Sequence, residues 1–400
     1  MALYVHLPFC VSRCPYCDFT VYAGADARGP KAATAPLYQA VIRELELRAD
    51  AVDRAFGPRP ALGSLYFGGG TPSLAPLEVI ERIVAIARDR FGLAHDAEVT
   101  LEANPAPDER GDLPRLRGAG VNRLSFGAQS MDAAELRRLG RRHSPEDVAA
   151  AVAAARQAGF ESINLDLLYD IPGQSVASWE ATLRAALALG PDHLSLYALT
   201  LDDPDSEGLT GEGGDHQPTT PGARRWRERA RAGQDDDRAA EQYGLATAFL
   251  AGEGWRGYEI SNWARPGHES RHNLAYWQRL PYEAVGPGAH AFDGVTRRWN
   301  PASMVAYLGA LLPAEGSAHL PLGGEEALSP ETASSEELIL ALRLDSGVPV
   351  SAAEQPPLRE SREWAEQAGL LEVFELEGEP RLRLSLRGRL LSSELFARLV

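Results

Sequence analysis

The feature that most constrains the fold is a regular alternation of short strand-like runs with helical runs through the first half of the chain. The strand-like runs are apolar and β-rich, and several end in Gly, Asn or Asp. They occupy residues 3–7, 64–70, 98–104, 122–127, 162–170 and 193–199. The helical runs between them include residues 36–52, 75–91, 144–159 and 175–190. Because parallel strands need long crossovers, this alternation predicts a parallel sheet.

The ends of the helical runs carry matching signals. Ser144 precedes Pro145 and Ser175 precedes another helical run, as expected for N-caps. Gly159 and Gly190 suit helix C-termini. We therefore expect an α/β fold built on a partial (β/α)6 barrel, with its functional groups at the C-terminal ends of the strands.

The second half of the chain has a different pattern. Residues 202–225 are polar and rich in Gly and Pro, which predicts a mobile loop. Residues 224–254 are helical in pattern with a charged first half, and residues 255–264 resemble one more strand. From about Ser329 the order helix, helix, β-wing, helix predicts a small C-terminal winged-helix-like domain. We expect four parts: a barrel at residues 1–205, a loop or insertion at 206–235, an α+β barrel extension at 236–325 and the C-terminal domain at 326–400.

Composition excludes several classes of function. The formal net charge is -16, which argues against a nucleic-acid binder, whose affinity comes mainly from Lys and Arg. No apolar run approaches the ~20 residues of a membrane helix, and the N-terminus lacks the pattern of a secretory signal. The chain has three cysteines, all between residues 10 and 17, too few and too close for a disulfide framework. We expect a cytoplasmic protein.

The three cysteines have the spacing Cys10-x3-Cys14-x2-Cys17. Buried structural cysteines would not be gathered in one loop behind the first strand. A structural zinc would need a fourth ligand, for which His6 is a candidate. A [4Fe–4S] cluster held by three thiolates would leave one iron open to a small molecule. The residues alone leave zinc and the cluster as alternatives.

Cys-x3-Cys-x2-Cys behind the first strand of a βα barrel resembles the radical S-adenosylmethionine (SAM) superfamily. In that superfamily SAM chelates the open iron of the [4Fe–4S] cluster. Further motifs support the resemblance: the glycine loop at residues 67–73, the strand-end carboxylate of LEANP, SFGAQS at 125–130 and NLDLLYDIPGQ at 164–174. Arg141 could bind the SAM carboxylate through its guanidinium, with Arg142 as the alternative. The resemblance thus implies a SAM site made of Tyr4, Gly69, Gly70, Thr71, Glu102, Gln129, Arg141 and Asp166.

YVHLPFC, CxxxCxxCDF and NLDLLYDIPGQ together resemble a subgroup that contains oxygen-independent coproporphyrinogen III oxidases and HemW-type heme chaperones. The resemblance covers nearly the whole chain. In the oxidases a fourth cysteine follows the third by two positions, where this chain has Phe19, and an extension precedes the cluster motif, where this chain has nine residues. Both features favour the chaperone over the oxidase.

SRHNLAYW at residues 270–277 matches the RHNxxYW signature of the chaperone group. A neutral imidazole is a common axial ligand of heme iron, and aromatic neighbours such as Tyr276 and Trp277 could pack on a porphyrin. We therefore expect His272 to bind heme. His290 in GPGAHAF is the competing candidate. A histidine beside Asn and aromatic residues can also be a structural residue that forms hydrogen bonds within the protein.

The resemblance implies a heme chaperone that binds a [4Fe–4S] cluster and SAM and passes heme to a heme-requiring protein. The acceptor could be a respiratory enzyme at the membrane, and a homodimer is compatible with the family. The alternative is radical SAM decarboxylation of coproporphyrinogen III. A tRNA-modifying radical SAM enzyme is disfavoured because the chain has no basic RNA-binding domain.

Overall fold

The computed structural model describes residues 1–24, 33–56, 61–201 and 218–400. Six parallel strands form the centre of one large sheet, and each pairs with the next strand along the chain. They are β1 (Ala2–Leu7), β2 (Leu62–Gly69), β3 (Leu93–Ala103), β4 (Arg123–Gln129), β5 (Ser162–Tyr169) and β6 (His193–Ala198). The predicted parallel sheet is confirmed.

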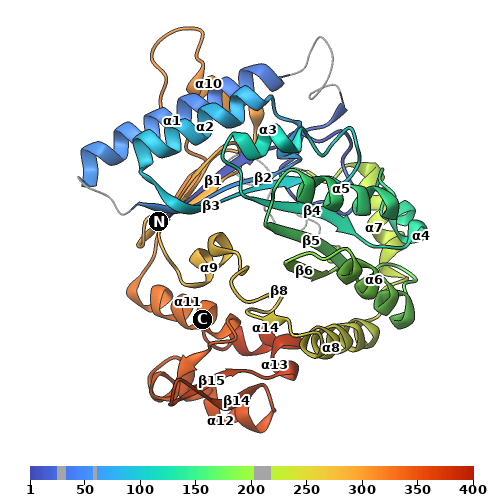
Figure 1. The fold of residues 1–400 in the computed structure, drawn as a ribbon. Helices are drawn as coiled ribbons and strands as arrows, with labels where there is room; N and C mark the ends of the chain where they lie inside the picture. Colours follow the sequence, from blue (N-terminus) through green and yellow to red (C-terminus); the bar gives the residue numbers. More distant parts are fainter. Residues whose placement is uncertain (25–32, 57–60, 202–217) are drawn as a thin grey trace.

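Crossover helices cover the outer face of this sheet (Figure 1). The Ser144 side chain accepts from the N–H of Asp147 in a capping box, and Ser175 also caps its helix. Gly159 and Gly190 follow the helix ends with φ of 84° and 68°, which a residue with a Cβ rarely adopts. The helices are α1 (Thr34–Phe56), α2 (Leu77–Phe91), α3 (Leu113–Gly118), α4 (Ala133–Arg138), α5 (Pro145–Gln157) and α6 (Val176–Ala188), with the 3-10 turn η2 (Pro72–Leu74) behind β2.

Short strands extend the sheet at both edges. Beside β1 lie β9 (Tyr282–Val285), which is parallel to it, and the antiparallel β10 (His290–Phe292), β11 (Thr296–Trp299) and β12 (Gly324–Ala327). Beside β6 lie the antiparallel β8 (Asn262–Ala264) and β7 (Arg256–Gly257). In the described residues β12 and β7 remain separate edges. The barrel is therefore partial, as predicted.

Two predicted elements after the barrel are wrong in detail. The helix expected at 224–254 is divided into α7 (Pro221–Arg231) and α8 (Asp236–Gly252), because Gly233 follows α7 and Asp235 caps α8. The strand expected at 255–264 is a pair of short antiparallel strands, β7 and β8. Residues 202–217 of the loop expected at 202–225 lie outside the described residues, whereas residues 221–225 are not a loop but the first turn of α7, which Thr220 and Pro221 begin.

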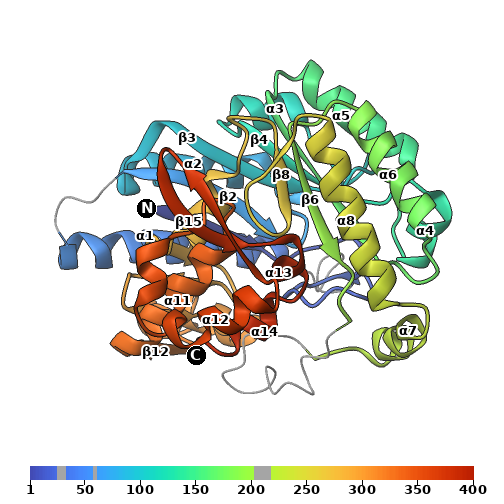
Figure 2. The same ribbon diagram turned by 90° about the horizontal axis from the view of Figure 1, so that it is seen from below.

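The C-terminal region has the expected winged-helix-like order and a hydrophobic cluster of its own (Figure 2). Its sheet has the order β13–β15–β14. The elements are α11 (Pro330–Arg343), β13 (Val348–Pro349), η3 (Val350–Glu354), α12 (Leu358–Gln367), β14 (Leu371–Leu376), β15 (Glu379–Leu384), α13 (Leu386–Leu390) and α14 (Ser392–Phe396). The exact domain boundaries stay a prediction.

Two further helices pack on the barrel. The signature region forms α9 (Arg271–Trp277), which contacts β2 on the side of the sheet away from α1 and α2 (Figure 1). Helix α10 (Met304–Leu311) packs against α1. In the described part of the chain, no helix is both long and apolar enough to cross a membrane.

Candidate functional site

The cysteine loop, residues 8–22, leaves the C-terminal end of β1 and returns beside it. The N–H of Cys10 donates to the carbonyl of Tyr22 at 3.0 Å, which ties the two ends of the loop together. The N–H of Cys17 donates to the carbonyl of Cys14 at 3.1 Å. All three cysteines are free thiols and partly exposed. The loop thus presents its cysteines at the edge where barrel proteins place their functional groups.

Two polar side chains from other loops, those after β2 and after α4, reach the cysteine sulfurs. The hydroxyl of Thr71 donates to Cys10 Sγ at 3.5 Å, and Nη1 of Arg141 donates to Cys14 Sγ at 3.5 Å. Burial raises the pKa of Cys10 to about 11 and that of Cys17 to about 12, so both thiols stay protonated unless a cation stabilises the thiolate. Donors directed at cysteine sulfur fit an iron–sulfur cluster, whose properties depend on such hydrogen bonds.

A single metal ion fits this site less well. In residues 1–24, 33–56, 61–201 and 218–400, no three His, Cys, Asp or Glu side chains converge as the ligands of one ion would. His6 is 6% exposed, and its ring bonds to the Tyr4 hydroxyl at 3.0 Å and the Thr20 carbonyl at 2.8 Å. His6 is therefore not directed at the thiols as a fourth zinc ligand. A cubane cluster binds each thiolate through a different iron, so its cysteines need not converge on one point.

The glycine loop packs directly on the cysteine loop. The N–H of Gly70 donates to the Leu7 carbonyl at 3.0 Å, and the N–H of Thr71 donates to the Phe9 carbonyl at 2.8 Å. A Cβ on Gly70 would lie 2.6 Å from the backbone of Pro8, so only glycine allows this approach. The two loops form one surface around the cysteines.

Two partly buried carboxylates lie on β3 and β5, the two strands that flank β4. Glu102 accepts the hydroxyl of Tyr66 at 2.8 Å and the N–H of Gly69 at 3.1 Å. Asp166 accepts from Ser125 at 3.1 Å and from Asn164 at 2.7 Å. Burial raises the pKa of Glu102 to about 7 and also raises the pKa of Asp166. Both positions can therefore accept further hydrogen bonds from a ligand that stabilises their charged form.

Of the two candidate arginines, Arg141 lies at the cysteines and Arg142 does not. Besides Cys14, Arg141 donates to Asn104 Oδ1 at 2.5 Å and to the Gly127 carbonyl at 2.8 Å. Arg142 is bound to Asp108 at 3.0 Å and to Glu109, away from the thiols. Gln129 ends β4 in the left-handed region with φ of 66°. These positions keep Arg141 as the candidate for binding an anionic group.

A cavity of about 480 Å³ adjoins the cysteine loop, within the range of small-molecule sites. Phe19 lies at this cavity and is 63% exposed. Among the residues that the structure describes, two side chains that line the cavity have a buried donor without a hydrogen-bond partner, namely Nη2 of Arg279 and Nε1 of Trp277. Buried donors normally have a partner, so an acceptor on a ligand or a water molecule would satisfy them. The wall also includes Tyr4, His6, Asp18, Thr20, Tyr276, Tyr282, His290, Phe292, Arg297 and Glu336.

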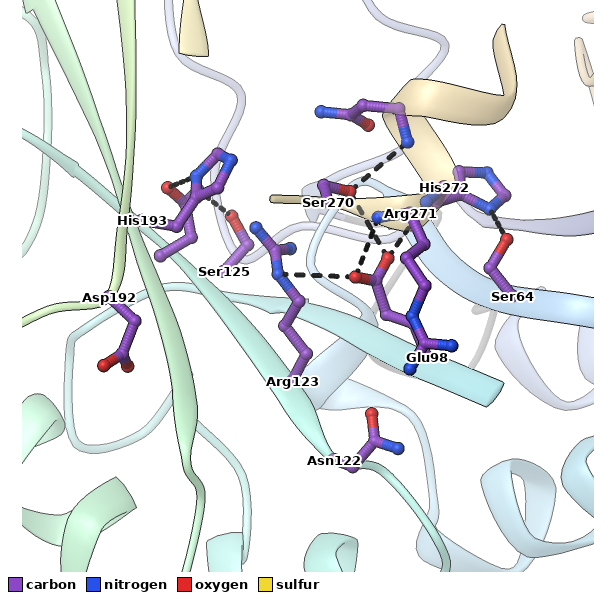
Figure 3. Close-up of polar contacts among 12 residues, drawn as sticks. Ser64, Glu98, Asn122, Arg123, Ser125, Asp192, His193, Ser270, Arg271 and His272 are labelled. Carbon is purple, nitrogen blue, oxygen red and sulfur yellow. Dashed lines mark hydrogen bonds and ion pairs between the residues drawn. The ribbon is translucent and has the colours of Figure 1, made fainter. Parts of the chain in front are cut away.

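His272, expected to bind heme, is not among the residues that line the cavity. It is 1% exposed, its Nδ1 bonds to the Ser64 hydroxyl at 2.9 Å (Figure 3), and its Nε2 bonds to the Tyr276 hydroxyl at 2.8 Å. The backbone N–H of His272 donates to the Glu98 carboxylate, which also accepts from the Ser270 hydroxyl. Desolvation lowers the pKa of His272 to about 3, so the ring is neutral. In this arrangement a heme iron reaches neither nitrogen, because both are bonded within the protein.

The competing candidate, His290, does lie on the cavity wall. It begins β10, is exposed, and stacks on Trp299 with ring centroids 5.8 Å apart. His272 contacts the cavity indirectly, through Tyr276, a lining residue whose hydroxyl it binds. The geometry thus favours His290 over His272 for contact with a ligand in the cavity.

Sequence reasoning missed several residues that complete the site. Asn104 bridges Thr71 at 3.1 Å and Arg141, and it follows Glu102 by two positions in LEANP. Alternation along β3 could have identified it, because Glu102 and Asn104 fall on the same face of an extended chain. Tyr66, which stacks on His272 at 4.9 Å, had no comparable signal.

Comparisons with known proteins agree with this geometry. A family model described as the radical SAM superfamily matches residues 4–186. The heme chaperone HemW of Mycobacterium tuberculosis is 39% identical over 393 residues, which cover 98% of this chain and 92% of that protein. The heme chaperone HemW of Synechocystis is 34% identical and covers 87% of this chain and 79% of that protein.

A mitochondrial radical S-adenosyl methionine domain-containing protein 1 of Mus musculus is 39% identical, over 72% of this chain and 60% of that protein. Among solved structures, coproporphyrinogen III oxidase from Escherichia coli, a radical SAM enzyme, has a similar fold. Its TM-score is 0.76 at 24% identity, covering 100% of this chain and 89% of the oxidase chain. The identity to HemW over nearly the full length of both chains places this protein in the HemW family of the radical SAM superfamily.

Proposed function

We propose that this protein is a heme chaperone, which holds heme in the cavity beside the cysteine loop and passes it to a heme-requiring acceptor. The observation that carries this proposal is the shared wall between the two sites. Residues 18–20 follow Cys17 directly and line the cavity of about 480 Å³. The names of the HemW relatives support the same function.

In this proposal Cys10, Cys14 and Cys17 hold a [4Fe–4S] cluster and SAM binds at its open iron. When bound, the cluster and SAM together supply one-electron chemistry. Arg141 binds the SAM carboxylate, and Glu102 accepts hydrogen bonds from the ribose hydroxyls. The backbone of the glycine loop faces the amino group, and the rest of the SAM site is made of Tyr4, Gly69, Gly70, Thr71, Gln129 and Asp166.

Heme fits the cavity through three kinds of contact. Phe19 and Tyr276 offer aromatic faces to the porphyrin. Arg279 and Trp277 each have a buried donor without a partner among the described residues, and heme propionates would satisfy these donors. His290 is the proposed axial ligand, because it lies on the cavity wall whereas His272 does not.

Delivery of heme requires an acceptor protein. We propose a heme-requiring acceptor, such as a respiratory enzyme at the membrane, served from the cytoplasm. A homodimer belongs to the same proposal. Mixing heme-loaded protein with an apo-acceptor and following the Soret band of each after separation tests the transfer.

A titration of the anaerobically reconstituted protein with hemin tests the cavity. We expect His290→Ala to weaken binding and shift the Soret band, whereas His319→Ala, at an exposed histidine outside the cavity, serves as the control. His272→Ala should weaken binding less, through Tyr276. Loss of binding in His272→Ala with full binding in His290→Ala would overturn the ligand assignment.

A second assay distinguishes the chaperone from an oxidase of similar fold. The reconstituted protein receives coproporphyrinogen III, SAM and a reductant, and the porphyrins are separated chromatographically. We expect no decarboxylation beyond a cluster-free control. Formation of protoporphyrinogen IX would contradict the chaperone proposal.

A further inference from the structure

Helix α7 carries several arginines, and one of them is buried against the cysteine loop. Arg227 is 4% exposed, whereas the other arginines of the helix are exposed. Its Nε donates to the Pro15 carbonyl at 3.1 Å, and its Nη2 donates to the Cys17 carbonyl at 3.0 Å. One guanidinium thus donates to two backbone carbonyls in the segment that runs from Cys14 to Cys17.

Neighbouring contacts hold the same part of the loop from a second side. The indole of Trp226 lies 6.3 Å from the Tyr16 ring and donates to the Arg138 carbonyl at 3.1 Å. A Cβ on Gly140 would lie 3.2 Å from Pro15, so the loop also packs on the turn after α4. Tyr16 and Trp226 cover a small apolar cluster made of Leu139, Leu168, Ile171, Leu199, Leu201 and Ala230.

The position of α7 is itself fixed by the barrel. Thr220 caps the helix by accepting from the N–H of Ala223, and Pro221 occupies its first turn. At the other end, the Gly233 carbonyl accepts from the N–H of Gly173 at 3.2 Å, which ties the end of α7 to the loop behind β5. The contact of Arg227 therefore comes from an anchored helix.

We propose that Arg227 is a positioning residue for the iron–sulfur cluster: it clamps the cysteine loop and holds a positive charge beside the three thiolates. The inference rests on the proposed cluster at Cys10, Cys14 and Cys17. It gives a role to the arginine-rich helix α7, which the family resemblance alone does not explain.

The chemistry of the guanidinium suits both parts of this role. Arginine stays charged even when it is buried, and its planar fork can donate to two carbonyls at once. Three thiolates concentrate negative charge, which a nearby cation stabilises. Charge close to an iron–sulfur cluster also sets its reduction potential. Lysine would retain the charge but not the double contact.

The clamp can be tested without the cluster. Iodoacetamide is added to three cluster-free proteins: wild type, Arg227→Met and the control Arg225→Met. Arg225 lies at an exposed position of the same helix. Mass spectrometry follows alkylation at each cysteine. We expect Arg227→Met to react about tenfold faster at Cys14 and Cys17, and Arg225→Met to match wild type. Equal rates in all three proteins would overturn the clamp.

The charge is tested on the reconstituted protein. We expect Arg227→Met to shift the cluster potential to a more negative value and to release iron to a chelator faster than Arg225→Met. Arg227→Lys should keep the wild-type potential and release iron at an intermediate rate. An unchanged potential in Arg227→Met would overturn the electrostatic role.

Circular dichroism verifies that each variant folds. If Arg227→Met does not fold, the alkylation and iron-release rates of Arg227→Lys test the clamp instead. Wild-type rates in Arg227→Lys would then refute the double contact. If wild type takes up no cluster, the proposed function fails, whereas the alkylation of the cluster-free protein still decides the clamp.

Discussion

Replacing Glu44 with Gln should destabilise the fold strongly, because this fully buried carboxylate joins α1 to the loop behind β9. Glu44 accepts from Arg48 at 2.9 Å, from the N–H of Gly286 at 2.9 Å, from Asn300 at 2.8 Å and from Tyr307 at 2.6 Å. Gly286 begins the loop that carries His290 to the cavity. The same network therefore supports both the fold and the cavity.

The magnitude follows from the buried ion pair. Side-chain exposure is 7% for Arg48 and 0% for Glu44, so a glutamine leaves the guanidinium without its main counter-charge. Removing one partner of a buried pair costs about 3–5 kcal/mol. Glu46→Gln is the matched control on the same helix: its carboxylate is 30% exposed and pairs with Arg82 at 3.0 Å, so we expect a loss of at most about 1 kcal/mol.

Urea unfolding followed by far-UV circular dichroism measures both variants. A double variant, Glu44→Gln with Arg48→Met, should recover part of the loss because it removes the uncompensated charge. If Glu44→Gln unfolds within about 1 kcal/mol of Glu46→Gln, the buried pair contributes little and the reasoning is wrong.

Three further predictions concern the ligand sites. Arg141→Lys should weaken SAM binding about tenfold by calorimetry, since lysine lacks the guanidinium fork, while Arg142→Lys should not; equal losses would refute the assignment. Phe19→Ala should weaken hemin binding by about 1.5–3 kcal/mol, because its exposed ring loses the contact area with the porphyrin, and an unchanged affinity would remove Phe19 from the site. Burial raises the pKa of Glu102 from 4.5 to about 7, so the contribution of its protonated form to stability is fully present below pH 4.5 and is lost as the pH rises through about 7. In a plot of the urea midpoint against pH, Glu102→Gln should therefore flatten the slope between these two values. An unchanged slope would contradict this prediction.

Local patterns predicted the barrel well. Apolar strand periodicity, the N-caps at Ser144 and Ser175 and the glycines after the helices are short-range signals, so they can be read directly from the chain. The division of residues 224–254 into two helices was missed, although Gly233 and Asp235 carry the signal for it. The positions of the proposed SAM site came from the resemblance of short motifs to the radical SAM superfamily.

The roles of the histidines depended on packing that spans hundreds of residues. RHNLAYW alone made His272 a reasonable heme ligand, but Ser64, more than two hundred residues earlier, occupies its Nδ1. The position of His290 on the cavity wall depends on the parallel pairing of β9 with β1, which sets Tyr282 beside Ala2 and which no local pattern encodes.

The sequence by itself determined the family, the parallel barrel and the gathering of three cysteines in one loop, because each depends on residues close together in the chain. Only the tertiary structure decided that Arg141, not Arg142, reaches Cys14, that His272 is enclosed, and that Arg227 grips the loop. Such contacts depend on the direction in which each side chain leaves its own element and on what another element places there. That information exists only after the chain has packed.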